Sequence, residues 1–261
     1  MFNSKKATKL VLASTLALGV LASSVPAFAN NSTGDLEFSG YVATDVQQAF
    51  IPSVKLPTDV ATHWASASVS NMVYMGVLKG YPDNTFRPDK AVARAEFASA
   101  LKNALFLPNA EELAELKDLS AKHWAAKSVS SVLPYLPAYP DGTFRPGASA
   151  TREDVAVALV LATGLDKRVI DPTNIDIIFK DAKTVSPDLK NLIAIAVDQK
   201  LIKGFKVKES SGQYTDAAGE KYNLYLKAQN FVTRGEMANL LDNAREKVSL
   251  GYKVLPASGD E

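Results

Sequence analysis

Two nearly identical stretches decide how this chain is organised. Residues 80–88 read GYPDNTFRP, and residues 139–146 read YPDGTFRP. His-Trp-Ala precedes each stretch, at residues 63–65 and 123–125, and in both copies a second arginine follows the first by seven residues. Because motifs that recur in one order at similar spacing are typical of internal repeats, the chain is predicted to contain repeated structural units.

A third, degenerate copy lies toward the C-terminus. Leu226-Lys227-Ala228 stands where the other copies have Phe-Arg-Pro, and Arg234 again follows by seven residues. The third copy carries an insertion around residues 210–221, which is polar and contains glycine and is therefore predicted to be a loop. The three copies are expected to span residues 57–107, 116–165 and 179–247.

Each copy is predicted to fold as a helix, a turn and a second helix. In the first copy, apolar residues recur at helical spacing between residues 64 and 77, and Gly80 suits the end of that helix. One pair of short helices cannot bury both of its apolar faces, whereas three pairs packed together can. The expected fold is therefore all-α, with pseudo-threefold character. The apolar residue of each turn is predicted to fill the core: Phe86, Phe144 and Leu226.

The first 29 residues are predicted to be a secretory signal peptide. Three lysines between residues 5 and 9 precede an apolar run at 10–22, and residues 27–29 offer an A-x-A cleavage site. A membrane anchor needs about 20 apolar residues, which this run does not reach. The mature protein is expected to be exported without membrane insertion. Residues 30–56 are read as an N-terminal segment and residues 248–261 as a C-terminal tail.

The composition narrows the possible functions. The chain has 29 Lys and Arg, 28 Asp and Glu, two His and no Cys. The balanced charge argues against nucleic-acid binding, which normally needs a strongly basic surface. The lack of cysteine excludes disulfides, cysteine-ligated zinc and thiol catalysis, and two histidines are too few for a histidine-rich metal site. We expect neither a metal nor a cofactor.

Arg94, Arg152 and Arg234 recur at the first position of a predicted helix. The helix dipole disfavours a cation there by about 0.3–1 kcal/mol, so three such placements indicate another purpose. Together with the N–H groups of the helix end, each guanidinium could bind an anion such as a carboxylate. The alternative is a salt bridge between copies, to Asp83, Asp141 or another acid.

Glu96, Asp154 and Glu236 follow the predicted start of the same helices. Thr151 with Asp154, and Thr233 with Glu236, match capping boxes, in which the acid reaches back to the first residue of the motif. A purely structural role is therefore an alternative to ligand binding.

Trp64 and Trp124 are the only tryptophans of the chain. They either pack in the core or between copies, or present an aromatic face to a sugar ring. Arg87, Arg145 and Lys227 keep a positive charge at one position of each copy, where they either line a groove or are exposed to solvent.

These motifs resemble the S-layer homology domain of bacterial cell-surface proteins. That family shows an early Trp, a G-Y-x-D-G-T-F-x-P turn and a T-R-A-E start of the second helix. The first copy has Trp64, residues 80–88 and Ala93-Arg94-Ala95-Glu96; the second has Trp124, residues 139–146 and Thr151-Arg152-Glu153-Asp154; the third keeps Thr233-Arg234-Gly235-Glu236.

The resemblance implies a three-pronged spindle of three repeats at the bacterial cell wall or S-layer. It also implies non-covalent binding to a pyruvylated secondary polysaccharide linked to peptidoglycan, without enzymatic activity. The glycan-binding residues that it implies are Arg94, Arg152, Arg234, Trp64, Trp124, Glu96, Asp154, Glu236, Arg87, Arg145 and Gly80.

The sequence departs from the family pattern at a few positions. Ala93 replaces the family's Thr, Ala138 replaces its Gly, and the third copy lacks the Trp and the glycine-bearing turn. If each groove needs both a Trp and an Arg, the first two motif sets should carry most of the affinity. Because grooves can form between neighbouring copies, Arg234 could instead act with the Trp of another copy.

Two other functions are considered. Asp83 with Glu96, and Asp141 with Asp154, are paired acids of the kind that hydrolyse glycosides. However, they recur with the repeat, and no hydrolase or P-loop signature accompanies them. The other alternative is an exported scaffold that binds a surface protein which the sequence does not identify.

Overall fold

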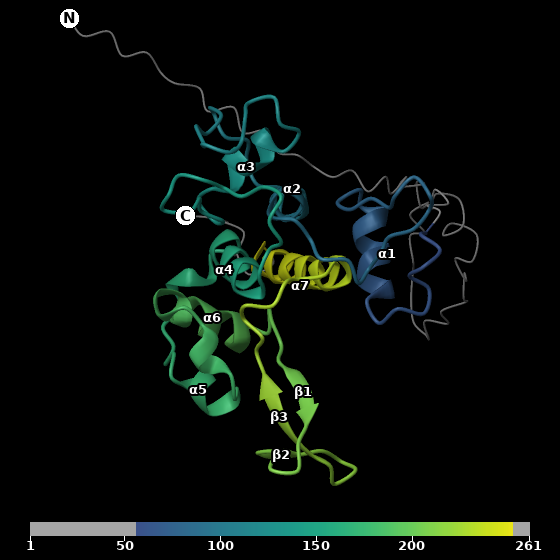
Figure 1. Cartoon of the computed structure of the whole chain (residues 1–261), viewed down its shortest axis with the longest axis vertical. Coiled ribbons are helices and arrows are strands. Elements are labelled where there is room, and N and C mark those ends of the chain that lie inside the picture. Colours follow the sequence, from purple (N-terminus) through teal and green to yellow (C-terminus); the bar gives the residue numbers. More distant parts are fainter. Residues whose placement is uncertain (1–55, 253–261) are drawn as a thin grey trace, which may run out of the picture. The chain divides into compact units, whose positions relative to one another are not determined.

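The structure is a computed structural model that describes residues 56–252, so the predicted signal peptide and residues 30–55 lie outside it. Each of the three copies contributes two helices, which Figure 1 labels: α1 (Ser66–Tyr74) and α2 (Arg94–Ala104) in the first copy, α3 (Ala126–Val132) and α4 (Arg152–Ala162) in the second, and α6 (Lys190–Asp198) and α7 (Arg234–Tyr252) in the third. A short α5 (Asn174–Ile178) precedes the third pair, and 3-10 turns cover Leu165–Lys167, Ala182–Thr184 and Pro187–Leu189. Within residues 56–252 we find no helix with the length and apolar character that crossing a membrane requires.

The third copy shows that the expected all-α class is wrong. β1 (Phe205–Lys208), β2 (Tyr214–Thr215) and β3 (Lys221–Tyr225) form an antiparallel sheet in the order β1-β3-β2, where a loop is predicted (Figure 1). Along β1, half-buried Phe205 and Val207 alternate with exposed Lys206 and Lys208, which is the period of a strand. The chain therefore combines paired helices with one small sheet.

Glu209 fastens the sheet to the rest of the third copy. Its carboxylate accepts hydrogen bonds from Lys180, from the Tyr225 hydroxyl at 2.5 Å and from the Asn223 amide at 2.8 Å. The bond from Lys180, then those from Tyr225 and Asn223, lower the pKa of Glu209 to about 2. The carboxylate is therefore ionised at neutral pH and keeps all three partners.

An aspartate near the start of each copy holds the turn between the two helices. Asp59 accepts the N–H groups of Phe86 and Arg87 at 2.7 and 2.8 Å; Asp118 does the same for Phe144 and Arg145, and Asp181 for Leu226 and Lys227. Partial burial favours the neutral carboxyl of Asp59, but these hydrogen bonds outweigh it and lower its pKa. The second residue of each pair has a φ of +54° to +58°, which non-glycine residues rarely adopt. The first residue fills the core, as predicted.

Backbone hydrogen bonds join the three copies in a closed cycle. Val92 N donates to Val232 O, Val232 N to Ala150 O, and Ala150 N to Val92 O, at 2.8–2.9 Å. The helices follow this order, because α2 packs against α3, α4 against α6, and α7 against α1. Each packed pair of helices therefore combines two copies.

The repeated arginines reinforce this cycle from within the core. Each guanidinium donates from Nε and Nη2 to two backbone carbonyls of the next copy: Arg94 to Phe144 and Pro137, Arg152 to Leu226 and Lys203, Arg234 to Phe86 and Lys79, at 2.7–3.1 Å. The three residues are only 1–7% exposed. Nη1 of Arg94 lies 2.8 Å from Asp154, and Nη1 of Arg152 lies 3.6 Å from Glu236. The sequence left salt bridges between copies as the alternative to an anion site, and Arg94 and Arg152 form them. Their partners are Asp154 and Glu236, not Asp83 and Asp141.

Replacing Arg94 by alanine should destabilise the whole fold. The substitution removes a buried charge from Asp154 and leaves two carbonyls without donors, so we expect the free energy of unfolding to fall by about 3–5 kcal/mol. Arg87→Ala is the matched control, because Arg87 is half-exposed and its ion pair with Asp83 is screened by solvent, so its loss should lower the free energy of unfolding far less. Urea denaturation measures both, and equal losses would contradict the role of Arg94 as a joint.

Two substitutions of Asp118, which accepts two backbone N–H groups of the turn, should lower the free energy of unfolding to different extents. Asp118→Ala removes the acceptor of two N–H groups and should cost about 3 kcal/mol of unfolding free energy. Asp118→Asn keeps one side-chain oxygen and should cost about half as much. Thermal and urea unfolding of the two variants measure the difference. An Asn variant as unstable as the Ala variant would contradict a stabilising role of the two hydrogen bonds.

Ala93 offers a gain in stability. It is the N-cap of α2, where Glu96 already accepts its N–H at 3.0 Å, but its side chain cannot cap the helix. In α4, Thr151 Oγ1 accepts the N–H of Asp154 at 3.1 Å. Ala93→Thr should complete the same box and raise the unfolding free energy by about 0.5–1 kcal/mol, whereas Thr151→Ala should lower it by a similar amount. An unchanged or lower unfolding midpoint for Ala93→Thr would refute this.

Candidate functional site

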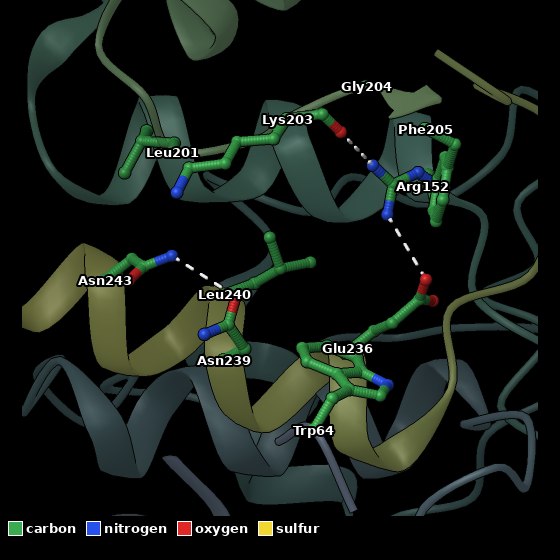
Figure 2. A pocket seen from close by; sticks show the side chains of 10 residues that line it. All are labelled: Trp64, Arg152, Leu201, Lys203, Gly204, Phe205, Glu236, Asn239, Leu240 and Asn243. Carbon is green, nitrogen blue, oxygen red and sulfur yellow. Dashed lines mark hydrogen bonds and ion pairs between the residues drawn. The ribbon is translucent and has the colours of Figure 1, made fainter. Parts of the chain in front are cut away.

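A groove of about 430 Å³ lies where the three copies meet (Figure 2). Its size is within the range of small-ligand sites in proteins. The second copy contributes Arg152 from α4, and the first contributes Trp64, which precedes α1. The third copy supplies the other lining residues: Leu201, Lys203, Gly204 and Phe205 after α6, and Glu236, Asn239, Leu240 and Asn243 on α7.

Arg152 presents only part of its guanidinium to this groove. Nε and Nη2 are used by the carbonyls of Leu226 and Lys203, and Nη1 points toward Glu236 Oε1 at 3.6 Å (Figure 2). The side chain is 6% exposed, and this burial lowers its pKa. Because an arginine stays protonated even so, the groove has a fixed positive charge at its inner end.

The helix ends beside the arginines are not available to an anion. The first two N–H groups of α4 donate to the carbonyls of Asn230 and Ala228, both at 2.9 Å. Those of α2 and α7 are paired with the next copy in the same way. The expected anion site on exposed helix N–H groups is therefore wrong, because the cycle of copies already uses them.

The two tryptophans lie on the surface. Trp64 is 65% exposed and Trp124 is 64% exposed, so neither is a core residue. Trp64 lines the groove of Arg152, not that of Arg94 in its own copy. For Trp64, the pairing of Trp and Arg within one copy is therefore wrong, and the alternative of a groove shared between copies applies.

The three acids cap their helices, as the capping boxes predict. Glu96 accepts the N–H of Ala93, while Asp154 and Glu236 accept those of Thr151 and Thr233. Glu236 has a second use, because its Oε1 faces Arg152 in the groove and only Oε2 is needed for the cap. Glu236 thus caps α7 with one carboxylate oxygen and lines the groove with the other.

Arg87 and Arg145 serve the turns. Each forms an ion pair with the aspartate four residues earlier, and its guanidinium lies about 4 Å from the centre of a tyrosine ring, Tyr81 or Tyr139. Both side chains are 48% exposed, and neither lines the groove of Arg152. The structure places them near the solvent.

Gly80 is required by a close approach of the backbone. A Cβ at this position would lie 3.0 Å from Thr85 O and 3.4 Å from Pro57. Gly204 is its counterpart in the third copy, where a Cβ would lie 2.4 Å from the Phe179 ring. Gly204 lines the groove of Arg152, whereas Gly80 does not.

Sequence reasoning missed several groove residues of the third copy. Gly204-Phe205 stands in the place of Gly80-Tyr81, and Phe205 stacks on Arg152 with 4.5 Å from the guanidinium carbon to the ring centre. The signal was this Gly-aromatic pair, which the inserted sheet separates from the rest of the motif. Lys203, Asn239 and Asn243 carry no motif of their own, so only the structure brings them to the site.

Comparison with known proteins supports the repeated motif. The model of the S-layer homology domain matches residues 58–98 and 136–156. These segments contain Trp64, both turns and the start of the second helix in the first two copies.

Relatives with this similarity are named as surface proteins. The chain is 37% identical over 106 residues to a cellulosome-anchoring protein of Acetivibrio thermocellus, covering 38% of this chain and 23% of the relative. It is 36% identical over 111 residues to cell surface glycoprotein 1 of the same organism, covering 38% and 5%. It is 31% identical over 193 residues to the surface-layer 125 kDa protein of Lysinibacillus sphaericus, covering 73% and 15%.

The chain thus spans less than a quarter of the length of these relatives. S-layer homology domains anchor proteins to the cell wall, and the relatives place this chain among secreted proteins of the cell surface. Residues 58–98 and 136–156, which contain Arg94 and Arg152, therefore match the S-layer homology domain family.

Proposed function

We propose that this chain attaches non-covalently to the bacterial cell wall by binding an acidic, pyruvylated secondary polysaccharide linked to peptidoglycan. One observation carries the proposal: the groove of Arg152 combines an exposed Trp, a buried cation and several polar side chains. A pyruvylated sugar offers the complementary groups, namely an apolar ring face, a carboxylate and hydroxyls.

Trp64 supplies the surface for the sugar ring. It is 65% exposed although it lines the groove, so its face is open to a ligand. Asn239 and Asn243 lie on α7 at the same groove, and amides both donate to and accept from hydroxyls (Figure 2). This arrangement supports recognition of a sugar more than of a purely apolar partner.

The charges of the groove support an acidic ligand. Nη1 of Arg152 faces Glu236 across 3.6 Å, which is longer than a charged hydrogen bond and leaves this nitrogen without a close acceptor. Lys203 adds a second cation at the same groove. A carboxylate bound there would gain from both, and added salt would weaken part of the attraction.

The enzymatic alternative has less support from the acids that suggested it. Hydrogen bonds from Thr85 and then Arg87 lower the pKa of Asp83 to about 2, and those from Thr143 and then Arg145 do the same for Asp141. A general acid in glycoside hydrolysis needs a pKa raised toward the working pH. The pKa values of Asp83 and Asp141 are lowered instead, so both carboxyls are ionised at neutral pH and have no proton to donate.

Sedimentation with purified cell-wall sacculi tests the proposal. The mature protein should bind native sacculi and lose most of its binding after the pyruvate is removed, because the carboxylate is the group that the cations recognise. Binding should also fall as the salt concentration rises.

The Trp64→Ala variant tests the role of the indole in the same experiment. Its substitution is at the surface and should leave the fold intact. Weaker sedimentation of this variant is expected if the indole contacts the sugar. Equal binding of the native protein to stripped and native sacculi would exclude the carboxylate as the recognised group, and absence of any binding would favour the scaffold alternative.

A further inference from the structure

Phe106 has a backbone conformation that favours glycine. It is the second residue after α2, and its φ is +52°. Gly164 occupies the matching place after α4, with a φ of +69°. This left-handed conformation is common for glycine at the end of a helix and is strained in a residue that has a Cβ. The first copy therefore carries an aromatic residue where the fold favours glycine.

The ring of Phe106 is presented to solvent and is not part of the core. Phe106 is 76% exposed and borders a groove of about 380 Å³ that the ends of α1 and α2 form. The other apolar residues of the groove are Met75, Val77 and Leu107. Strained residues often occur at binding sites, and Phe and Met are enriched in protein interfaces. These properties indicate a surface that contacts another protein.

Two cations lie beside this groove, which we call the Phe106 groove. Lys102 lines it from α2. Arg245 on α7 donates to the sulfur of Met75, and its guanidinium carbon lies 5.6 Å from the centre of the Phe106 ring. The groove therefore suits a partner that combines an apolar side chain with carboxylates.

A segment of the same chain has this combination of groups. Leu113 is 41% exposed, and the neighbouring Glu111, Glu112 and Glu115 are exposed as well. None of the three carboxylates has a hydrogen bond or an ion pair to a residue between 56 and 252. Because Leu113 is itself exposed, it does not fill the groove of its own chain and is available to a second copy.

Two serines of α3 hold this acidic segment in place. Oγ of Ser131 accepts the N–H of Ala110 at 3.1 Å, and Oγ of Ser130 accepts the N–H of Ala114 at 2.8 Å. α3 packs against α2, and the end of α2 forms the groove. The Phe106 groove and the acidic segment are thus both fixed beside α2, so neither needs a change of fold to be presented.

We propose that two copies of this chain form a dimer, in which the Phe106 groove of each copy takes Leu113 of the other. Lys102 and Arg245 then face the glutamates beside Leu113. Because each copy carries both surfaces, a two-fold axis satisfies both contacts at once and closes the assembly. This inference goes beyond attachment to the wall and does not depend on it, although a dimer would carry each wall-binding groove twice and gain avidity.

Analytical ultracentrifugation of the mature protein tests the inference. The wild type should dimerise as its concentration rises, and added salt should weaken the dimer because charge pairs contribute to it. Phe106→Gly should weaken dimerisation by about tenfold or more. The same substitution should leave the unfolding midpoint unchanged or raise it, since glycine is not strained at this φ. Thermal unfolding therefore separates loss of the interface from loss of the fold.

Leu113→Ser tests the other surface and should weaken dimerisation by a similar factor. Ile177→Ser is the matched control, because Ile177 on α5 is also an exposed aliphatic residue, at 66%. This control should dimerise as the wild type does.

An exchange of charges tests whether the partner is a second copy. Lys102→Glu and Glu112→Lys should each weaken self-association, because each change removes an attraction across the interface and introduces a repulsion. A mixture of these two variants should associate more tightly than either variant alone, since both contacts of the mixed dimer then join opposite charges. Lys183→Glu, at an exposed lysine of the third copy, is the control and should dimerise normally.

Several outcomes would overturn the inference. A wild type that stays monomeric at every concentration would leave the Phe106 groove to a different partner. Dimers that persist in both Phe106→Gly and Leu113→Ser, or that are lost only in Ile177→Ser, would place the interface elsewhere. Growth into assemblies larger than a dimer would contradict the two-fold arrangement.

Discussion

The contact on which the structure depends is the donation from each repeated arginine to two backbone carbonyls of the next copy. It costs the burial of three guanidinium groups, which is tolerated only because carbonyls and carboxylates surround them. In return, the start of each second helix is fixed to the turn of another copy. Tertiary contacts thus explain the unfavourable position of a cation at a helix start.

The same contact shapes the groove. Arg152 holds the carbonyl of Lys203, and this places Lys203, Gly204 and Phe205 opposite α7. Trp64 reaches the site from the first copy because α1 packs on α7. A groove of this kind does not exist in one copy alone, so the parts of the site are correctly placed only when the cycle has closed.

The sequence alone predicts the helix pairs, the turns and their buried residues, because residues 80–88 and 139–146 combine a helix stop, a turn and a core residue in one short motif. It does not predict the sheet, since the Ser and Gly residues between β1 and β2 dominate that segment and obscure the alternation of Phe205–Lys208. Nor does it show which Trp meets which Arg. That choice is made by the packing of helices from different copies, on which periodicity within one copy carries no information.

An open array of repeats can gain or lose a unit at either end, because each unit contacts only its neighbours. Among residues 56–252, the backbone bonds that join Val92, Val232 and Ala150 in a cycle leave no open end to which a unit could be added. A fourth unit could be inserted only if the backbone hydrogen bonds between two units were broken. Loss of a unit would leave two units with unpaired backbone groups. The number of units is therefore fixed, and changes in length must be absorbed inside a unit, as the sheet between residues 205 and 225 already is.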